Sequence, residues 1–204
     1  MAEWKDILLL GDSIGQGYWD QSMAGWFDRM MAKVGENYPY KFGAHNCAMS
    51  GDTSLDVYHR LCSEAASRRP DYLVIAVGIN DLVRFKKNPE QTWLSTEKSH
   101  ECWEWILDHA TKMYEKVLVV GLTAVIEERM PPEDEDFQYN SDAIKYNQML
   151  INFCKSYSIP YCDVFDVLKD KPELFRDSTH PNTEGHIELA NTVFAKLEEL
   201  KWLN

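Results

Sequence analysis

Ser13, Asp177 and His180 carry the three side chains that a nucleophilic centre for acyl chemistry requires. A serine hydroxyl attacks a carbonyl carbon, an imidazole takes the hydroxyl proton, and a carboxylate orients the imidazole and stabilises its charged form. Ser13 lies in the segment Gly11-Asp12-Ser13-Ile14-Gly15, where two glycines allow a sharp turn that exposes the hydroxyl. Because Asp177 and His180 lie near the other end of the chain, the centre requires a fold that brings both ends together.

Ser13, Gly51 and Asn80 are candidate donors to the oxyanion that forms when a serine attacks a carbonyl. The backbone N–H groups of Ser13 and Gly51 and the side-chain amide of Asn80 each follow a segment that is predicted to be a strand. The carboxyl ends of parallel strands share one edge of a sheet, and ligands bind at that edge. We therefore expect these three donors to converge there.

The same residues also have structural interpretations. Ser13 could cap a helix in a polar turn. His180, which is followed by Pro181, could open the last helix with Asp177 capping nearby. Convergence of the side chains distinguishes the catalytic interpretation from these alternatives.

Asp12, Tyr18 and Trp19 are candidate substrate contacts because they lie close to Ser13 in the sequence. Asp12 could instead brace its turn. Aromatic side chains such as Tyr18 and Trp19 can stack on sugars or acyl chains, and they can equally pack into a core.

Strand and helix patterns alternate between these turns. Apolar runs predict five strands, at residues 7–10, 41–49, 71–78, 117–121 and 159–163. Apolar residues at helical spacing predict helices at 21–37, 55–67, 92–115, 141–156 and 182–200. We expect a loop at 82–91 and irregular structure at 165–175. The pattern predicts a single domain over residues 1–204: a three-layer α/β/α sandwich with a five-stranded, mostly parallel sheet.

Four segments carry a resemblance to a known family. They are Gly11-Asp12-Ser13-Ile14, residues 46–51, Gly78-Ile79-Asn80-Asp81 and Asp177-Ser178-Thr179-His180-Pro181. In order and spacing they resemble the signature blocks of the SGNH hydrolases, also called GDSL lipases and esterases, over nearly the whole chain. Ile14, Ala48 and Ile79 depart from the family pattern without removing a functional group.

The resemblance implies a flavodoxin-like fold and a serine hydrolase that needs no metal and no cofactor. It places the nucleophile at Ser13, the general base at His180 and the orienting acid at Asp177. It places the oxyanion hole at Ser13, Gly51 and Asn80.

Charge and cysteine content narrow the classes of partner. The 204 residues include 33 acidic and 21 basic side chains, a formal net charge of -12, which disfavours nucleic acid as a partner. No segment predicts a signal peptide or a membrane span. The five cysteines show no paired spacing, which argues against a disulfide framework and a zinc site and favours a cytoplasmic location. The acidic segment at residues 127–136 is expected to be a solvated loop, with a lid or a cation-binding strip as alternatives.

These observations predict a serine esterase that acts on a small ester through an acyl-serine intermediate. Small acyl esters, thioesters and O-acetylated sugars are the candidate substrates, and acyl transfer to an alcohol is a variant of the same chemistry. The alternative is a non-catalytic domain that binds an acylated or glycosylated ligand.

A Gly-x-Ser-x-Gly elbow of the α/β-hydrolase kind is excluded because several strands precede that elbow, whereas only ten residues precede Gly11. A phosphate-binding loop is excluded because no Gly-Lys-Ser/Thr follows.

Overall fold

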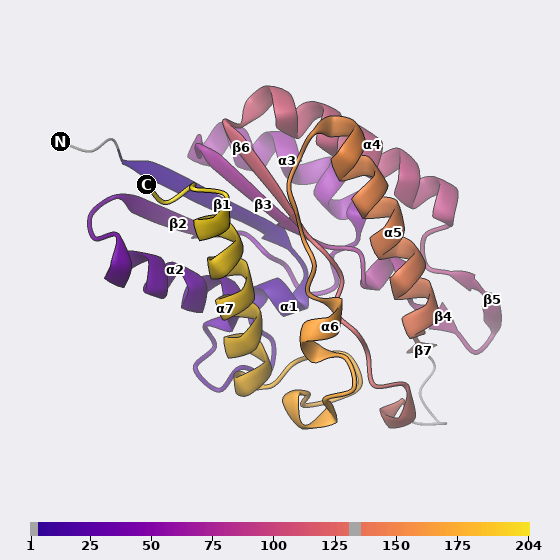
Figure 1. Ribbon diagram of the computed structural model, residues 1–204. Helices are drawn as coiled ribbons and strands as arrows, with labels where there is room; N and C mark the ends of the chain where they lie inside the picture. The colour runs from indigo at the N-terminus through magenta and orange to yellow at the C-terminus, as the bar shows by residue number, and fades with distance from the viewer. Residues whose placement is uncertain (1–3, 131–135) are drawn as a thin grey trace.

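A five-stranded parallel sheet, in the order β2-β1-β3-β6-β8, forms the centre of the structure (Figure 1). The structure is a computed structural model that describes residues 4–130 and 136–204. The strands are β1 (Lys5–Gly11), β2 (Phe42–Asn46), β3 (Tyr72–Ala76), β6 (Lys116–Val120) and β8 (Tyr161–Cys162). Every neighbouring pair is parallel, so the predicted sheet is confirmed.

Helices cover both faces of this sheet. On one face lie α2 (Gly25–Asn37) and α7 (Thr183–Glu199); on the other lie α3 (Ser54–Arg68), α4 (Thr96–Met113) and α5 (Asn140–Tyr157) (Figure 1). Short helical turns connect these elements: α1 (Ser13–Gln16), α6 (Phe165–Leu168), η1 (Asn80–Leu82), η2 (Glu127–Arg129) and η3 (Pro172–Leu174). The three-layer α/β/α architecture agrees with the prediction.

The apolar runs in the sequence became the buried strands. In β1 and β3, the side chains of Leu8, Leu9, Leu73 and Val74 are completely buried, because helices exclude water from both faces of a parallel sheet. On α2, Trp26, Met30 and Val34 are buried as their helical spacing predicts. The core therefore lies on both sides of the sheet and holds its strands in one register.

Strand register determines where the connecting turns leave the sheet. Gly11 in β1 pairs with Ala76 in β3, and Leu9 pairs with Asn46 in β2. The chain therefore leaves β1, β2 and β3 at the same edge, and the three turns expected to carry functional groups begin there.

A second, three-stranded sheet was not predicted. The strands β4 (Arg84–Phe85), β5 (Asn88–Thr92) and β7 (Asp136–Phe137) pair antiparallel in the order β5-β4-β7. Residues 84–92 thus form a hairpin, and the expectation of a loop over 82–91 was wrong in that part. The expectation for residues 165–175 was also wrong in part, because α6 and η3 lie within them. In the acidic segment, residues 127–130 and 136 are described, whereas 131–135 lie outside the described residues.

The described helices include none that is long and apolar enough to span a membrane. All five cysteines are free, and three of them are buried. Within residues 4–130 and 136–204, no group of three or more His, Cys, Asp or Glu side chains is arranged to hold a metal ion.

Candidate active site

The turn after β1 positions Ser13 at the first residue of α1. Asp12 is the N-cap of this helix, and its Oδ1 accepts a hydrogen bond from the backbone N–H of Ile14 at 3.0 Å. Gly17 ends the helix with a left-handed backbone, φ +91°. Asp12, not Ser13, is therefore the cap, and its contact with Ile14 matches the interpretation of Asp12 as a brace.

The loop before α7 positions His180. The backbone N–H of Arg176 donates to the carbonyl oxygen of His180 at 2.9 Å, which closes the loop on itself. Asn182 caps α7, because its Oδ1 accepts a hydrogen bond from the N–H of Gly185 at 3.0 Å. The interpretation of Asp177 as the helix cap is therefore wrong: Asn182 has that role.

Ser13, His180 and Asp177 form one continuous chain of hydrogen bonds. Oγ of Ser13 lies 3.0 Å from Nε2 of His180, and Nδ1 of His180 lies 2.8 Å from Oδ2 of Asp177. The other carboxylate oxygen of Asp177 accepts hydrogen bonds from the backbone N–H groups of Thr179 and His180, at 2.8 and 2.7 Å. This geometry allows a proton to move from the hydroxyl to the imidazole while the carboxylate holds the ring.

The pKa values of two carboxyl groups near the imidazole are shifted in opposite directions. Burial raises the pKa of Asp177, but hydrogen bonds from the side chain and N–H of His180 and from the N–H of Thr179 outweigh it and hold the pKa well below its usual range. Asp177 is therefore ionised at neutral pH. Burial raises the pKa of Asp12 to about 7, although the N–H of Ile14 and the charge of His180 oppose this shift.

Gly51 and Asn80 lie on adjoining turns after β2 and β3. The backbone of Gly51 has φ +86°, a conformation that favours glycine. The N–H of Met49 donates to the carbonyl of Gly11 at 2.9 Å, which holds the Gly51 turn against the turn that carries Ser13. Nδ2 of Asn80 donates to the carbonyl of Asp52 at 2.9 Å and so joins the two turns. The Asn80 amide carries a second N–H hydrogen that can serve a ligand.

Asp81 anchors the turn that carries Asn80. Its carboxylate is completely buried and accepts hydrogen bonds from the N–H and hydroxyl of Ser54 and from the hydroxyls of Ser99 and Tyr146. These partners belong to α3, α4 and α5. Burial raises the pKa of Asp81, and the four hydrogen bonds oppose this shift. Gly78 packs against the same tyrosine: its φ is +132°, and a Cβ atom there would lie 2.6 Å from the ring of Tyr146.

Tyr18 and Trp19 lie beside the imidazole and the carboxylate, and each is almost half exposed. The ring centre of Tyr18 is 4.8 Å from that of His180. Nε1 of Trp19 donates to Oδ2 of Asp177 at 2.8 Å. Both aromatic residues are therefore part of the site's surroundings, and their contact with a substrate stays a prediction.

Gln138 is a site neighbour that sequence reasoning missed. Its side chain is buried, and its amide contacts the main chain of Ile79 and the hydroxyl of Thr179. Gln138 and Thr179 are 41 residues apart, and no motif or spacing connects them. Only the fold reveals this contact.

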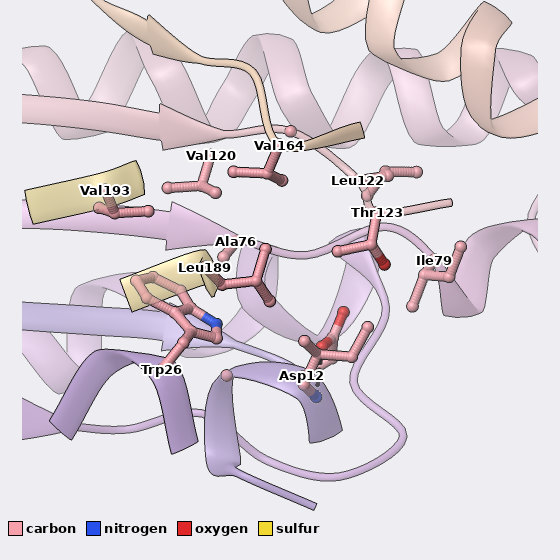
Figure 2. Close-up of a pocket in the computed structure, with 13 residues that line it drawn as sticks. Asp12, Trp26, Ala76, Ile79, Val120, Leu122, Thr123, Val164, Leu189 and Val193 are labelled. Carbon is pink, nitrogen blue, oxygen red and sulfur yellow. Dashed lines mark hydrogen bonds between the residues drawn. The ribbon is translucent and has the colours of Figure 1, made fainter. Parts of the chain in front are cut away.

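Figure 2 shows residues that line a cavity behind the turn that carries Ser13, between the sheet and the layer formed by α2 and α7. The volume of this cavity is about 30 Å³. Its walls are mainly apolar and include Trp26, Val120 and Leu189. Asp12 and Thr123 lie at the end near the carboxyl edge of the sheet, and Oγ1 of Thr123 has no hydrogen-bond partner in the described part of the chain. A cavity of this volume can hold a water molecule.

Comparisons with known proteins agree with this geometry. Residues 9–186 match the GDSL-like Lipase/Acylhydrolase family. "Thioesterase 1/protease 1/lysophospholipase L1" of Escherichia coli is 23% identical over 196 residues, which cover 95% of this chain and 84% of that protein.

Two solved structures share the fold. A lipase/acylhydrolase from Enterococcus faecalis has a TM-score of 0.78 at 20% identity and covers 96% of each chain. A catalytic mutant of an acetylxylan esterase from Geobacillus stearothermophilus has a TM-score of 0.77 at 15% identity, covering 97% of this chain and 95% of the other.

Proposed function

Because the chain belongs to the GDSL-like lipase/acylhydrolase (SGNH hydrolase) family of carboxylic ester hydrolases, we propose that it is a serine esterase for small acyl esters, with Ser13 as its nucleophile. The observation that carries the proposal is the hydrogen-bonded chain from Ser13 through His180 to Asp177, at 3.0 and 2.8 Å. A serine that only capped a helix would not require an imidazole from the other end of the chain.

In the first half of the proposed reaction, Oγ of Ser13 bonds to the carbonyl carbon of the substrate while Nε2 of His180 takes the proton of the Ser13 hydroxyl. The carbonyl π electrons move onto oxygen, and the N–H groups of Ser13 and Gly51 and the amide of Asn80 donate to that oxyanion. The oxyanion collapses, the bond to the leaving alcohol breaks, and His180 returns the proton to the alcohol. An acyl-serine remains.

In the second half, water attacks the acyl-serine and His180 takes the water proton. Collapse of the second oxyanion breaks the bond to Oγ, His180 returns the proton to Ser13, and the carboxylic acid leaves. Throughout, the ionised Asp177 holds the ring and stabilises the imidazolium that forms twice in each cycle.

Thioesters and O-acetylated sugars are included among the proposed substrates. The names of two similar proteins support them: the relative from Escherichia coli is named as a thioesterase and lysophospholipase, and one similar structure is an acetylxylan esterase. Both substrate kinds present a carbonyl to the same nucleophile.

Hydrolysis of p-nitrophenyl acetate by the wild type and by Ser13→Ala tests the proposal. The wild type should release p-nitrophenol with saturation kinetics, and Ser13→Ala should lose that activity while remaining folded. A panel of longer acyl esters, thioesters and acetylated xylose then ranks the substrate classes by kcat/KM. Undiminished hydrolysis by Ser13→Ala would show that another residue is the nucleophile.

A further inference from the structure

Gln138 lies between the two loops on which the proposed reaction depends. One loop carries Asn80 after β3, and the other carries His180 before α7. Gln138 belongs to neither, since it follows β7, and its side chain is only 7% exposed. A buried amide at this place has to bond to its neighbours, because an unsatisfied polar group away from water is costly.

Both ends of the Gln138 amide contact a catalytic loop. Nε2 donates to the carbonyl oxygen of Ile79 at 3.2 Å, and Oε1 accepts a hydrogen bond from Oγ1 of Thr179 at 2.8 Å. Ile79 immediately precedes Asn80, and Thr179 immediately precedes His180. The orientation of the amide is defined, because the Ile79 carbonyl can only accept and would repel the amide oxygen of a flipped side chain.

The main chain around Gln138 is also held by contacts other than those of its side chain. Its own N–H donates to Sδ of Met130 at 3.2 Å. Two residues further along, the side chain of Asn140 bonds to both the N–H and the carbonyl of Val125, at 2.9 and 2.8 Å. These contacts hold the main chain at the point from which the side chain of Gln138 bonds to Ile79 and Thr179.

We propose that Gln138 is a positioning residue that sets the placement of the Asn80 amide relative to the His180 imidazole. This inference rests on the proposed function, because it assigns a purpose to the placement of these two groups. They act on the same intermediate from different loops: Asn80 stabilises the oxyanion, and His180 moves the proton. A misplacement of about 1 Å can cost on the order of 100-fold in rate, so one side chain that bonds to both loops affects turnover without touching substrate.

Gln138→Met tests the inference, because methionine keeps the length and apolar body of the side chain and removes both hydrogen bonds. The matched control is Gln148→Met on the exposed surface of α5. We expect kcat for p-nitrophenyl acetate to fall about tenfold in Gln138→Met with KM unchanged, and Gln148→Met to match the wild type. Melting temperatures of both variants ensure that the rates are compared between folded proteins.

Double-mutant cycles show whether Gln138 acts through the two loops. Thr179→Val removes the hydroxyl that donates to Gln138, so Gln138→Met should cost less kcat in that background than in the wild type. Thr179→Ser keeps a hydroxyl and should retain more of the wild-type kcat than Thr179→Val. In the Asn80→Ala background the oxyanion donor is already absent, and Gln138→Met should again cost less.

Ser13→Ala, measured alongside, separates this inference from the proposed function. If the wild type hydrolyses the ester and Ser13→Ala does not, the proposed function stands. A Gln138→Met kcat equal to that of Gln148→Met would then overturn the positioning role. The positioning role would also be overturned if Gln138→Met lowered kcat by the same factor in the Thr179→Val and Asn80→Ala backgrounds as in the wild type. Gln138 would then act through neither loop.

Discussion

The indole N–H of Trp19 donates to Oδ2 of Asp177 at 2.8 Å, and the same oxygen lies 2.8 Å from Nδ1 of His180. Trp19 adopts a left-handed backbone with φ +66°, which is uncommon for a bulky residue. The guanidinium of Arg176 lies 5.6 Å from the centre of its ring. The indole N–H of Trp19 and Nδ1 of His180, which come from different parts of the chain, thus both contact Oδ2 of Asp177 and fix its direction.

Trp19→Phe removes the indole N–H and keeps an aromatic ring. We expect kcat to fall about fivefold with KM unchanged, since a half-exposed hydrogen bond to a carboxylate contributes about 1 kcal/mol. Steady-state kinetics on p-nitrophenyl acetate measure the effect, with Trp93→Phe, at an exposed tryptophan on the loop before α4, as the control. A rise in KM at unchanged kcat would instead make Trp19 a substrate contact.

Asn80→Ala removes the proposed side-chain donor to the oxyanion. Turnover should fall on the order of 10²–10³-fold, because the charge that develops on oxygen loses a preorganised donor. KM should change little, since the ground-state carbonyl is a weaker acceptor. Single-turnover rates of acylation provide the measurement, and a loss of only a few-fold would remove Asn80 from the oxyanion hole.

Asp12→Asn should change how stability depends on pH. Burial raises the pKa of Asp12 to about 7 in the folded protein, whereas the unfolded chain releases this proton near pH 4. Between these values the folded state holds the extra proton, so the contribution of Asp12 to the free energy of unfolding decreases as pH rises.

The variant lacks this contribution. We therefore consider the free energy of unfolding of Asp12→Asn minus that of the wild type. This difference should increase by about 1 kcal/mol for each pH unit between about pH 4 and about pH 7. Urea denaturation of both proteins at several pH values checks this. Parallel pH dependences would contradict a raised pKa at Asp12.

Asp81→Asn should destabilise the fold by about 3 kcal/mol, because it leaves buried donors of Ser54, Ser99 and Tyr146 without full partners. The midpoint of urea unfolding reports the loss. Asp166→Asn, at an exposed position on α6, is the control and should leave the midpoint unchanged. Equal midpoints for the two variants would mean that the Asp81 contacts contribute no net stability.

The sheet was predictable because its signals are local. The aliphatic run at residues 7–10 and the run at 73–75 become strands buried on both faces; β1 ends at Gly11, and a glycine, Gly78, also follows β3. The convergence of the turns after β1, β2 and β3 follows from the parallel order of the strands. The approach of Ser13 to His180 was expected from the family resemblance, since residues 167 positions apart carry no local signal.

The second sheet and the supporting contacts were not predictable for a physical reason. β5 consists of Asn88-Pro89-Glu90-Gln91-Thr92, which has no apolar alternation and lies largely exposed, so its pairing depends on β4. The contacts of Gln138 and of Trp19 join segments that lie far apart in the sequence. Polar residues of this kind have no periodicity that predicts a partner.

Fluorophosphonate labelling followed by peptide mass spectrometry tests the central claim most directly. The activated serine should displace fluoride and form one P–O bond, so the wild type should carry a single adduct on the peptide that contains Ser13. Ser13→Ala should carry none, and His180→Ala should label far more slowly. An adduct on another residue, or labelling of Ser13→Ala at the wild-type rate, would contradict the assignment of Ser13 as the nucleophile.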